Sequence, residues 1–248
     1  MKYISKYKSP NYNSRNNSKI KLIIIHYTAL KDITDAISYL CEKDKKVSSH
    51  YLISQKGEVF DLVDDKLRAW HAGVSYWKDS TDINSISIGI ELDYSSKGKN
   101  NKFSLKMITS LTLLLQKIQK KYKISRHNIL AHSDVAPFRK KDPGKFFPWK
   151  SLSSSGIILN HKKINKSNIK IINDWFQSYN IKSKKQKIIF ALSLIGYDTR
   201  KVSSNPKLYK KLLSAYSIRY LNQVDNKRNE FVYDTLINHL YKFLLTKN

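Results

Sequence analysis

The sequence predicts an α/β domain followed by a small module made only of helices, and three observations lead to this fold class. Short apolar segments typical of β-strands occur at residues 21–26, 50–63, 85–92 and 128–132. Two segments with helical spacing, residues 32–46 and 104–122, lie between them. After residue 167 only helical patterns follow. Alternating strands and helices are typical of α/β folds, whereas an uninterrupted helical stretch is typical of a separate bundle.

Length and composition indicate a globular protein. The chain has 248 residues, 41% of them hydrophobic, which is enough to bury a core in one large or two ordinary domains. Its apolar runs are far shorter than the roughly 20 residues of a membrane-spanning helix. No apolar segment follows the basic N-terminus, so the sequence lacks a recognisable secretory signal and favours a cytoplasmic location. The single cysteine, Cys41, excludes an internal disulfide.

The formal net charge of +27 predicts attraction to polyanions. The excess of lysine and arginine is spread along the chain, whereas dedicated nucleic-acid readers tend to concentrate it on one face or arm. No zinc finger, RNA-binding aromatic signature or basic region with heptads occurs. Most lysines are therefore expected on the solvated surface, and no specific nucleic-acid partner is predicted.

Residues 1–19 are predicted to form an irregular N-terminal arm. The next segment, KLIIIH at residues 21–26, is predicted to be a strand buried on both faces, with His26 at its carboxyl end. Ligands of α/β sheets gather at strand ends, so a functional histidine is expected there. For His26 taken alone, a core histidine bound by backbone groups remains the alternative.

The middle of the domain combines a helix, a hairpin and an aromatic loop. Residues 32–46 have the spacing of an amphipathic helix, and residues 50–63 are predicted to be a hairpin around Gly57, whose positive φ the turn requires. His50 is assigned a structural role. In the loop AWHAG, Trp70, His71 and Ala72 are candidate substrate contacts, because rings stack on sugars and small residues let a ligand approach the backbone. Simple packing is the alternative for each of them.

The last part of the domain supplies further polar candidates. Residues 85–92 alternate and run into Glu91, and a carboxylate at the end of an apolar run is either exposed or paired in a site. After the helix at residues 104–122, a short strand at residues 128–132 ends in His132. The loop that follows is stiffened by three prolines, each of which fixes one φ angle, and it holds Asp142 before Pro143.

A flexible, basic linker is predicted at residues 153–166, followed by a helical domain at residues 167–248. Its helices are expected at residues 169–179, 185–195, 206–220 and 230–245. About eighty residues lie near the lower limit for independent folding, so this domain is expected to lean on the first one.

These residue types suit a metal-dependent hydrolase. Catalytic zinc takes three protein ligands and a water, and His26, His132 and Asp142 offer two imidazoles and one carboxylate with a fourth position open. One zinc ion per chain is expected. The metal would lower the pKa of its water to about 7 and polarise a substrate carbonyl. Glu91 is the candidate general base, and Lys140 the candidate group that stabilises the oxyanion.

The motifs IIIHYTA, SSHYLI, AWHAGVSYW, SIGIEL and AHSDVAPFRKKDPG resemble, in order and approximate spacing, those of the zinc-dependent N-acetylmuramoyl-L-alanine amidases, the type-2 amidase family, and most closely its AmiD/AmpD type. The resemblance covers about residues 20–150, within a catalytic domain predicted at residues 20–152, and implies a mixed central β-sheet flanked by helices. It implies zinc binding by His26, His132 and Asp142, and catalytic roles for Glu91 and Lys140. Tyr27 becomes a candidate groove wall. The implied partner is bacterial peptidoglycan or a muropeptide, cut between the lactyl group of N-acetylmuramic acid and L-alanine; no oligomeric state is implied.

The tail resembles, more weakly, the three-helix peptidoglycan-binding module of AmiD-type enzymes. The stretches IIFALSLIGYDT, KLLSAYSIRYL and NEFVYDTLINHLYKFL carry this resemblance. The chain has Ala215-Tyr216 where those modules usually have Phe-Gln, so a stabilising role is an equal expectation. Because enzymes of this type are commonly exported, the periplasm, the cell envelope or secretion is the alternative location.

Two rival functions follow from the same sequence. A catalytically inactive peptidoglycan-binding protein of this fold would be expected to lack a metal ligand, and here all three are present with Glu91 and Lys140. A polyanion- or nucleic-acid-binding protein would bind more weakly as salt rises and would be indifferent to chelators.

Overall fold

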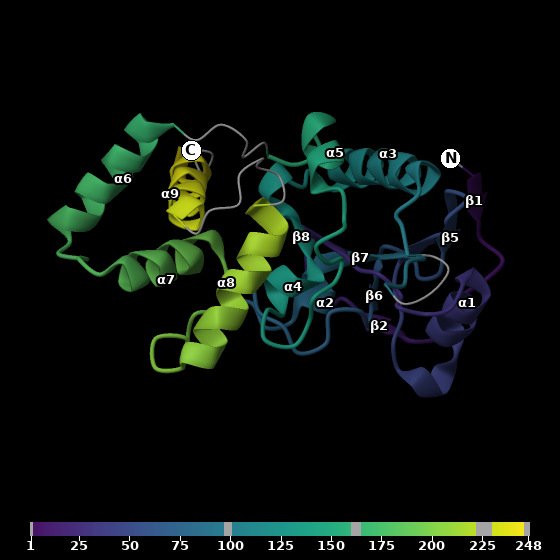
Figure 1. Cartoon of the computed structure of the whole chain (residues 1–248). Helices are drawn as coiled ribbons and strands as arrows, with labels where there is room; N and C mark the ends of the chain where they lie inside the picture. Colours follow the sequence, from purple (N-terminus) through teal and green to yellow (C-terminus); the bar gives the residue numbers. More distant parts are fainter. Residues whose placement is uncertain (1, 97–100, 160–164, 222–229, 246–248) are drawn as a thin grey trace.

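The computed structural model describes residues 2–96, 101–159, 165–221 and 230–245 (Figure 1). Six strands form the central sheet, and their bounds are β1 (Lys2–Ile4), β3 (Leu22–Ile25), β4 (Tyr51–Ile53), β5 (Glu58–Asp61), β7 (Ser87–Leu92) and β8 (Ile129–Ala131). Their order across the sheet is β1-β5-β4-β7-β3-β8, and every pair is parallel except β4 with β5. The predicted mixed sheet is confirmed.

Strand β3 lies inside the sheet, and all four of its residues are buried. Leu22 and Ile24 point into one apolar cluster, while Ile23 and Ile25 point into another on the opposite face. Side chains that alternate between two buried faces give a continuous apolar run, and this explains the sequence LIII. The predicted strand buried on both faces is confirmed.

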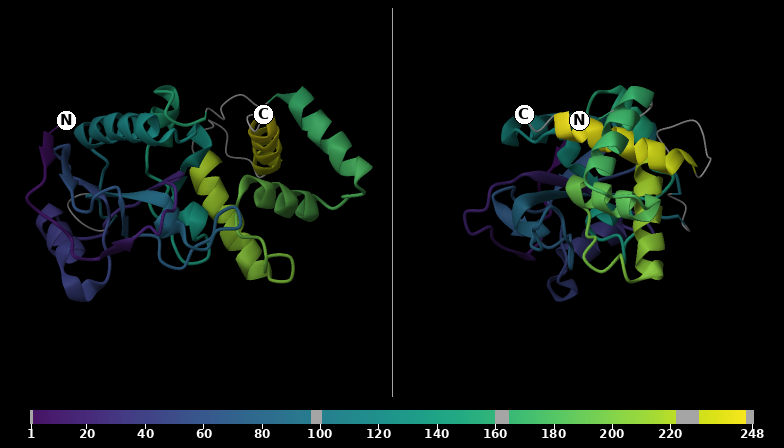
Figure 2. Two further views of the ribbon diagram at one scale, coloured as in Figure 1. Left: turned by 180° about the vertical axis from the view of Figure 1, so that it is seen from behind. Right: turned by 90° about the vertical axis from the view of Figure 1, so that its left-hand side faces the viewer.

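Helices cover both faces of the sheet (Figures 1 and 2). Helix α3 (Leu105–Tyr122) and the short α5 (Trp149–Ser154) pack on one face with Ile23 and Ile25. Helix α1 (Ile33–Cys41) packs beside β4 and β5. It ends earlier than the predicted residue 46, and a 3-10 turn (Lys43–Lys45) without buried residues follows.

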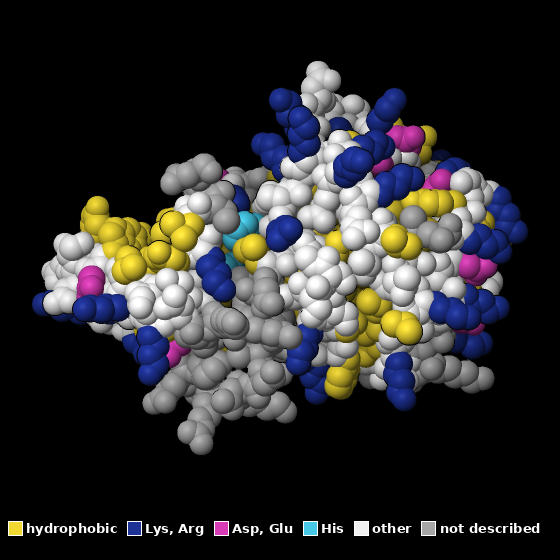
Figure 3. All heavy atoms as spheres, turned by 90° about the horizontal axis from the view of Figure 1, so that it is seen from above, with side chains coloured by type: hydrophobic (Ala, Val, Ile, Leu, Met, Phe, Trp, Pro, Cys, Tyr) yellow, Lys and Arg dark blue, Asp and Glu magenta, His cyan; other side chains and the backbone are white. Residues whose placement is uncertain are grey.

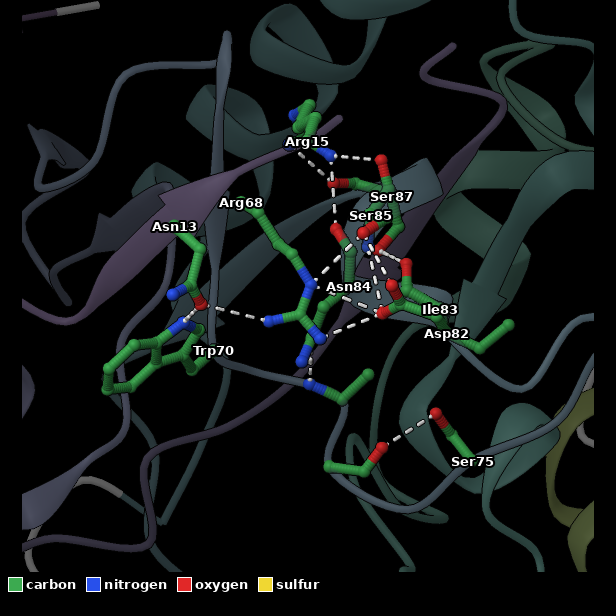
Figure 4. Close-up of polar contacts among 12 residues, drawn as sticks. Asn13, Arg15, Arg68, Trp70, Ser75, Asp82, Ile83, Asn84, Ser85 and Ser87 are labelled. Carbon is green, nitrogen blue, oxygen red and sulfur yellow. Dashed lines mark hydrogen bonds and ion pairs between the residues drawn. The ribbon is translucent and has the colours of Figure 1, made fainter. Parts of the chain in front are cut away.

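The N-terminal arm was predicted to be irregular, and this prediction is wrong in part. Strand β1 pairs with β5, and β2 (Tyr12–Ser14) pairs with β6 (Leu67–Ala69) as a separate antiparallel ribbon. Beyond β2, the buried guanidinium of Arg15 donates to the backbone carbonyls of Asp65, Asn84, Ser85 and Ser87, in part as shown in Figure 4. Three-residue strands are too short to show periodicity, and their partners lie more than fifty residues away.

The hairpin of β4 and β5 is confirmed, with Gly57 at φ 78° in its turn. The two later strands are shorter than predicted. A helical turn, α2 (Ile83–Ile86), precedes β7, and the Asp82 carboxylate caps it by accepting from the Ser85 N–H. Strand β8 ends at Ala131, because His132 already begins the helical turn α4 (His132–Val135).

All four C-terminal helices are confirmed, as α6 (Lys166–Ser178), α7 (Lys184–Ile195), α8 (Pro206–Tyr220) and α9 (Glu230–Leu245). Asn205 caps α8 by accepting from the Lys207 and Leu208 N–H groups, next to Pro206 in the first turn. Part of the predicted linker, residues 160–164, lies outside the described residues, and α5 occupies its start.

The C-terminal helices share a core with the sheet. One buried apolar cluster contains Leu22, Ile24 and Leu130 of the sheet together with residues of α6 to α9. Helix α8 contacts α4 and lies between the sheet and the other three helices (Figures 1 and 2). Among the described residues, no helix combines the length and the apolar character needed to cross a membrane.

Candidate functional site

The site lies where three neighbouring parallel strands end. Strands β7, β3 and β8 are adjacent, and Ile25 is in register with Ile90 on one side and with Ala131 on the other. The residues that follow these three positions are Glu91, His26 and His132. Parallel register therefore brings together side chains that are up to 106 residues apart in the sequence.

Asp142 joins the two histidines from the proline-rich loop. His26 Nδ1 lies 2.9 Å from His132 Nδ1, and Asp142 Oδ2 lies 3.3 Å from the first and 2.9 Å from the second. All three residues are buried. Donor atoms about 2.0–2.1 Å from a tetrahedral metal ion are roughly 3.3 Å apart, so this spacing matches three ligands of one ion.

A chain of hydrogen bonds fixes which nitrogen of His26 carries the proton. The Ser87 hydroxyl donates to the Ile83 carbonyl (2.6 Å), because a carbonyl can only accept. Ser87 Oγ then accepts from His71 Nε2–H (3.1 Å), which leaves His71 Nδ1 as an acceptor. His26 donates its Nε2–H to that nitrogen (3.0 Å), so its Nδ1 keeps a lone pair for the cluster.

The imidazole rings of His26 and His71, which are linked by these hydrogen bonds, are both neutral near pH 7. Burial, reinforced by the neighbouring His132, lowers the pKa of His26 to about 4. Burial, with His26 beside it, holds the pKa of His71 well below its usual value. The His71 ring fits only because residue 89 is glycine: a Cβ there would lie 2.4 Å from the ring. The glycine of SIGIEL is therefore part of the site.

His132 is oriented in the same way by a backbone group. Its Nε2–H donates to the Ala72 carbonyl (3.0 Å), and its Nδ1 faces Asp142. Ala72 is fully buried, and its backbone carbonyl rather than its side chain takes part in the site. The small side chain instead lets the carbonyl of the loop approach the imidazole.

The electrostatics of the cluster favour a cation. With both Nε2 protons donated elsewhere, two Nδ1 lone pairs and one carboxylate oxygen point at one another. Such groups repel unless a positive charge lies between them. Two imidazole nitrogens and a carboxylate oxygen are ligands that suit zinc.

Glu91 borders this cluster with one oxygen partnerless. Its Oε1 lies 4.0 Å from His26 Nδ1, and its Oε2 is buried without a hydrogen-bond partner among the described residues. Burial raises the pKa of Glu91 to about 8; the nearby Asp142 carboxylate adds to this rise and Lys140 opposes it. A carboxyl group with a pKa near neutrality is suited to take and return a proton.

A cavity of about 620 Å3 opens onto the cluster. Its walls include Tyr27, Trp70, His71, Glu91 and Lys140, so three of the four predicted substrate contacts lie in it. His71, however, uses both ring nitrogens within the protein, which makes it a support of His26 rather than a polar contact for a ligand. The Trp70 indole N–H donates to Asn13 Oδ1, which orients its ring (Figure 4).

Two groups of supporting residues were not predicted. Asn84 Oδ1 accepts from the backbone N–H groups of His71 and Ala72 and so holds the aromatic loop. Asp134 is fully buried two residues after His132 and accepts from the Tyr197 hydroxyl (2.6 Å). No local pattern in the sequence sets Asp134 apart, because it follows two polar residues, His132 and Ser133.

Comparison with known proteins identifies relatives of this chain. The sequence profile of the Amidase_2 family, described as N-acetylmuramoyl-L-alanine amidase, matches residues 16–145. N-acetylmuramoyl-L-alanine amidase AmiD of Escherichia coli is 40% identical over 152 residues, which cover 56% of this chain and 54% of that protein. 1,6-Anhydro-N-acetylmuramyl-L-alanine amidase AmpD of Haemophilus influenzae is 34% identical over 166 residues, covering 59% of this chain and 89% of the relative. A solved structure of E. coli AmiD with anhydro-N-acetylmuramic acid-L-Ala-D-γ-Glu-L-Lys superposes with a TM-score of 0.73 at 26% identity, covering 98% of this chain and 95% of that one.

Proposed function

Because the chain belongs to the Amidase_2 family of N-acetylmuramoyl-L-alanine amidases, we propose that it hydrolyses the amide bond between N-acetylmuramic acid and L-alanine of the peptidoglycan stem peptide. The aligned sequence spans about half the length of the E. coli AmiD relative. The observation that carries the proposal is the convergence of three ligand atoms with Glu91 at the ends of three parallel strands.

The metal in this proposal is one zinc ion, held by Nδ1 of His26, Nδ1 of His132 and Oδ2 of Asp142. The donor set supports zinc, because neutral imidazoles and a carboxylate are the ligands of hydrolytic zinc sites. When bound, zinc polarises a substrate carbonyl and lowers the pKa of a coordinated water to about 7. The hydrogen bonds from His26 to His71 and from His132 to Ala72 keep the coordinating nitrogens free of protons.

In this proposal Glu91 transfers the proton, and Lys140 stabilises the negative charge that develops on the substrate. Glu91 takes a proton from the attacking water as the water oxygen bonds to the carbonyl carbon. Lys140, in the wall of the same cavity, donates a hydrogen bond to the oxygen on which negative charge develops. As the carbon–nitrogen bond breaks, Glu91 returns the proton to the nitrogen, so the products are a free carboxylate on muramic acid and the amine of L-alanine.

The proposed substrates are soluble anhydro-muropeptides and, in the wall itself, the same amide of intact peptidoglycan. The complex of E. coli AmiD with an anhydro-N-acetylmuramoyl tripeptide supports the first class. Action on the soluble class corresponds to wall recycling in the cytoplasm, and action on the wall corresponds to the cell envelope.

The test is mass spectrometry of the products formed from purified sacculi and from soluble anhydro-muropeptides. The metal content of the purified protein is measured in parallel. Loss of turnover with EDTA and recovery with zinc are expected, together with release of peptides that begin with L-alanine. Unchanged turnover in EDTA, or cleavage at a different bond, contradicts the proposal.

A further inference from the structure

A second cavity, of about 610 Å3, adjoins the one that opens onto the metal cluster. Tyr27, Arg139, Lys140 and Lys141 line both cavities, so the two share a wall. The far wall of the second cavity comes from α8, which contributes Lys211 and three further residues. This cavity therefore lies between the proline-rich loop and a C-terminal helix.

The lining of the second cavity is strongly cationic. Five basic side chains surround it and no aspartate or glutamate among the described residues does; the five are Arg139, Lys140, Lys141, Lys145 and Lys211. Lysine and arginine side chains lie at many separate places on the face seen in Figure 3, so one lysine in the wall of a cavity carries little information. Five cations without a carboxylate, from two segments about seventy residues apart, make a local field that attracts anions.

We propose that this second cavity binds the carboxylate groups of the substrate peptide, and that Lys211 of helix α8 and Lys145 of the proline-rich loop hold them. The inference rests on the proposed function, because it names which part of that substrate lies where. The C-terminal helices then complete the substrate site.

The charges of the two cavities favour this orientation over the reverse. Arg139, Lys140 and Lys141 border both cavities, so the difference lies in the other residues. The first cavity adds the carboxylates of Glu91 and Asp142 and the ring of Trp70, whereas the second adds the cations of Lys145 and Lys211. Carboxylates repel an anionic peptide, whereas an indole offers a face on which a sugar ring can pack. The scissile amide lies between the two cavities if the sugar occupies the first and the peptide the second, because Lys140 borders both.

Lys211 is held across the cavity in a defined position. Its Nζ donates to the Phe138 carbonyl (2.8 Å), which anchors the cation of α8 next to the loop that carries Asp142. An ammonium group has three donors, so two remain for a carboxylate. Ala215 lies in the same wall and is buried, and its small side chain leaves room for a ligand.

The experiment compares two substrates in the full-length, zinc-loaded protein. One is the muramoyl tripeptide with its free carboxylates, and the other is muramoyl-L-alanine amide, in which the alanine carboxyl is blocked. For Lys211→Gln, which keeps a donor for the Phe138 carbonyl but removes the charge, we expect KM for the tripeptide to rise about five- to tenfold. We expect kcat to be retained, and KM for the blocked substrate to be unchanged.

Matched variants separate charge from structure. Lys211→Arg keeps the charge, so its KM for the tripeptide should equal that of the unmodified protein. Lys145→Gln should raise KM for the tripeptide while α8 keeps its sequence. Lys210→Gln, at an exposed position of α8, should leave KM unchanged for both substrates. Equal KM values for the tripeptide in Lys211→Gln, Lys145→Gln and the unmodified protein overturn the proposal.

Binding of a free peptide, which involves no hydrolysis, tests this inference separately from the proposed function. Titration of the free tripeptide L-Ala-D-γ-Glu-L-Lys into the protein by calorimetry should give binding that weakens with salt and with Lys211→Gln. If neither muramoyl substrate is hydrolysed, the proposed function fails while this titration still tests the cavity. Peptide binding that is identical in Lys211→Gln overturns the inference even if hydrolysis is normal.

Discussion

His71 is not one of the three proposed metal ligands, but we expect it to affect metal affinity through His26. Its Nδ1 accepts a hydrogen bond from His26 Nε2–H and its Nε2–H donates to Ser87 Oγ, so it fixes the tautomer of a proposed metal ligand. Substitution of such supporting partners typically weakens metal affinity about 10–100-fold. We expect a loss of this size in the zinc affinity of His71→Ala, measured by competition with a chelator.

The control for this prediction is His71→Asn, which keeps an acceptor oxygen close to the Nδ1 position and should recover part of the affinity. Circular dichroism of both variants shows whether the fold is kept. Unchanged zinc affinity in folded His71→Ala would mean that the hydrogen-bond chain does not act on His26.

Glu91 is expected to act on the proton rather than on the metal. Glu91→Gln has nearly the same shape but no basic oxygen, so its zinc affinity should be retained while kcat falls about 10²–10⁴-fold. Stopped assays with a muropeptide and metal analysis measure the two quantities. Glu42→Gln, at an exposed position, is the control. Turnover at the parent rate in Glu91→Gln would remove this residue from the mechanism.

At the level of single residues, the sequence indicated the three candidate metal ligands but not the residues that hydrogen-bond to them. His26, His132 and Asp142 end apolar runs or precede a proline, and the family motifs contain them. The contact of Ala72 with His132 was not predicted, because it is made by a backbone carbonyl, which has no sequence signature. The place of the His71 ring depends on Gly89 of β7, and no local sequence pattern shows that these two residues lie close together.

Between elements, Asp65 joins the end of α3 to the sheet. Its carboxylate accepts from Lys121 Nζ, from the Tyr122 hydroxyl and from the Tyr51 hydroxyl of β4. Burial alone would raise the pKa of Asp65, but these hydrogen bonds outweigh burial and hold the pKa below its usual value. The native state therefore favours the ionised form.

The sign of the pH dependence follows from this lowered pKa. Above the unfolded pKa of about 3.9 the full stabilisation is present, and it is lost as pH falls through the lower folded pKa. We expect Asp65→Asn to reduce the free energy of unfolding by about 2 kcal/mol at pH 7. The difference from the unmodified protein should narrow only below about pH 4.

Urea unfolding at a series of pH values measures this difference, with Asp44→Asn, at an exposed position, as the control. A constant difference between Asp65→Asn and the parent down to the lowest pH would show that the carboxylate charge is not the cause.

Long elements were predictable and short ones were not. The helices α3, α7 and α8 have enough turns for their apolar spacing and their ends to be visible, including Asn205 and Gly196. Strands β1 and β2 have three residues each, and their position is decided by distant partners and by Arg15. Such pairing is a tertiary effect that overrides local propensity.

For the whole molecule, the C-terminal helices are bound to the metal-ligand region through a buried ion pair. Arg219 of α8 donates to the Ile129 carbonyl (2.6 Å), and its Nε lies 3.3 Å from the carboxylate of Asp134. Both side chains are almost completely buried. Asp134 follows the ligand His132 in α4, so this pair connects the helices to the site.

Removing the cation should therefore affect both stability and metal binding. Arg219→Met leaves a buried carboxylate without its positive partner, which typically costs about 3–5 kcal/mol. We expect a drop of this order in the free energy of unfolding, together with weaker zinc binding. Arg200→Met, on the surface, should change neither quantity. Parent-like stability of Arg219→Met would mean that the ion pair between Arg219 and Asp134 does not contribute to holding the helices on the sheet.

The formal net charge of +27 is not gathered into one region on the face of the molecule that Figure 3 shows. On the face seen in Figure 3, lysine and arginine side chains lie at many separate places. Among the described residues, five basic side chains do come together around the second cavity beside the cluster.

Titration of zinc into the metal-free protein and into Asp142→Ala tests the central claim most directly, namely that three side chains share one ion. We predict one zinc per chain in the parent protein, and an affinity lowered more than about a hundredfold in the folded variant, because a direct ligand contributes more than a supporting residue. Equal zinc affinity and stoichiometry in the two proteins would contradict the account.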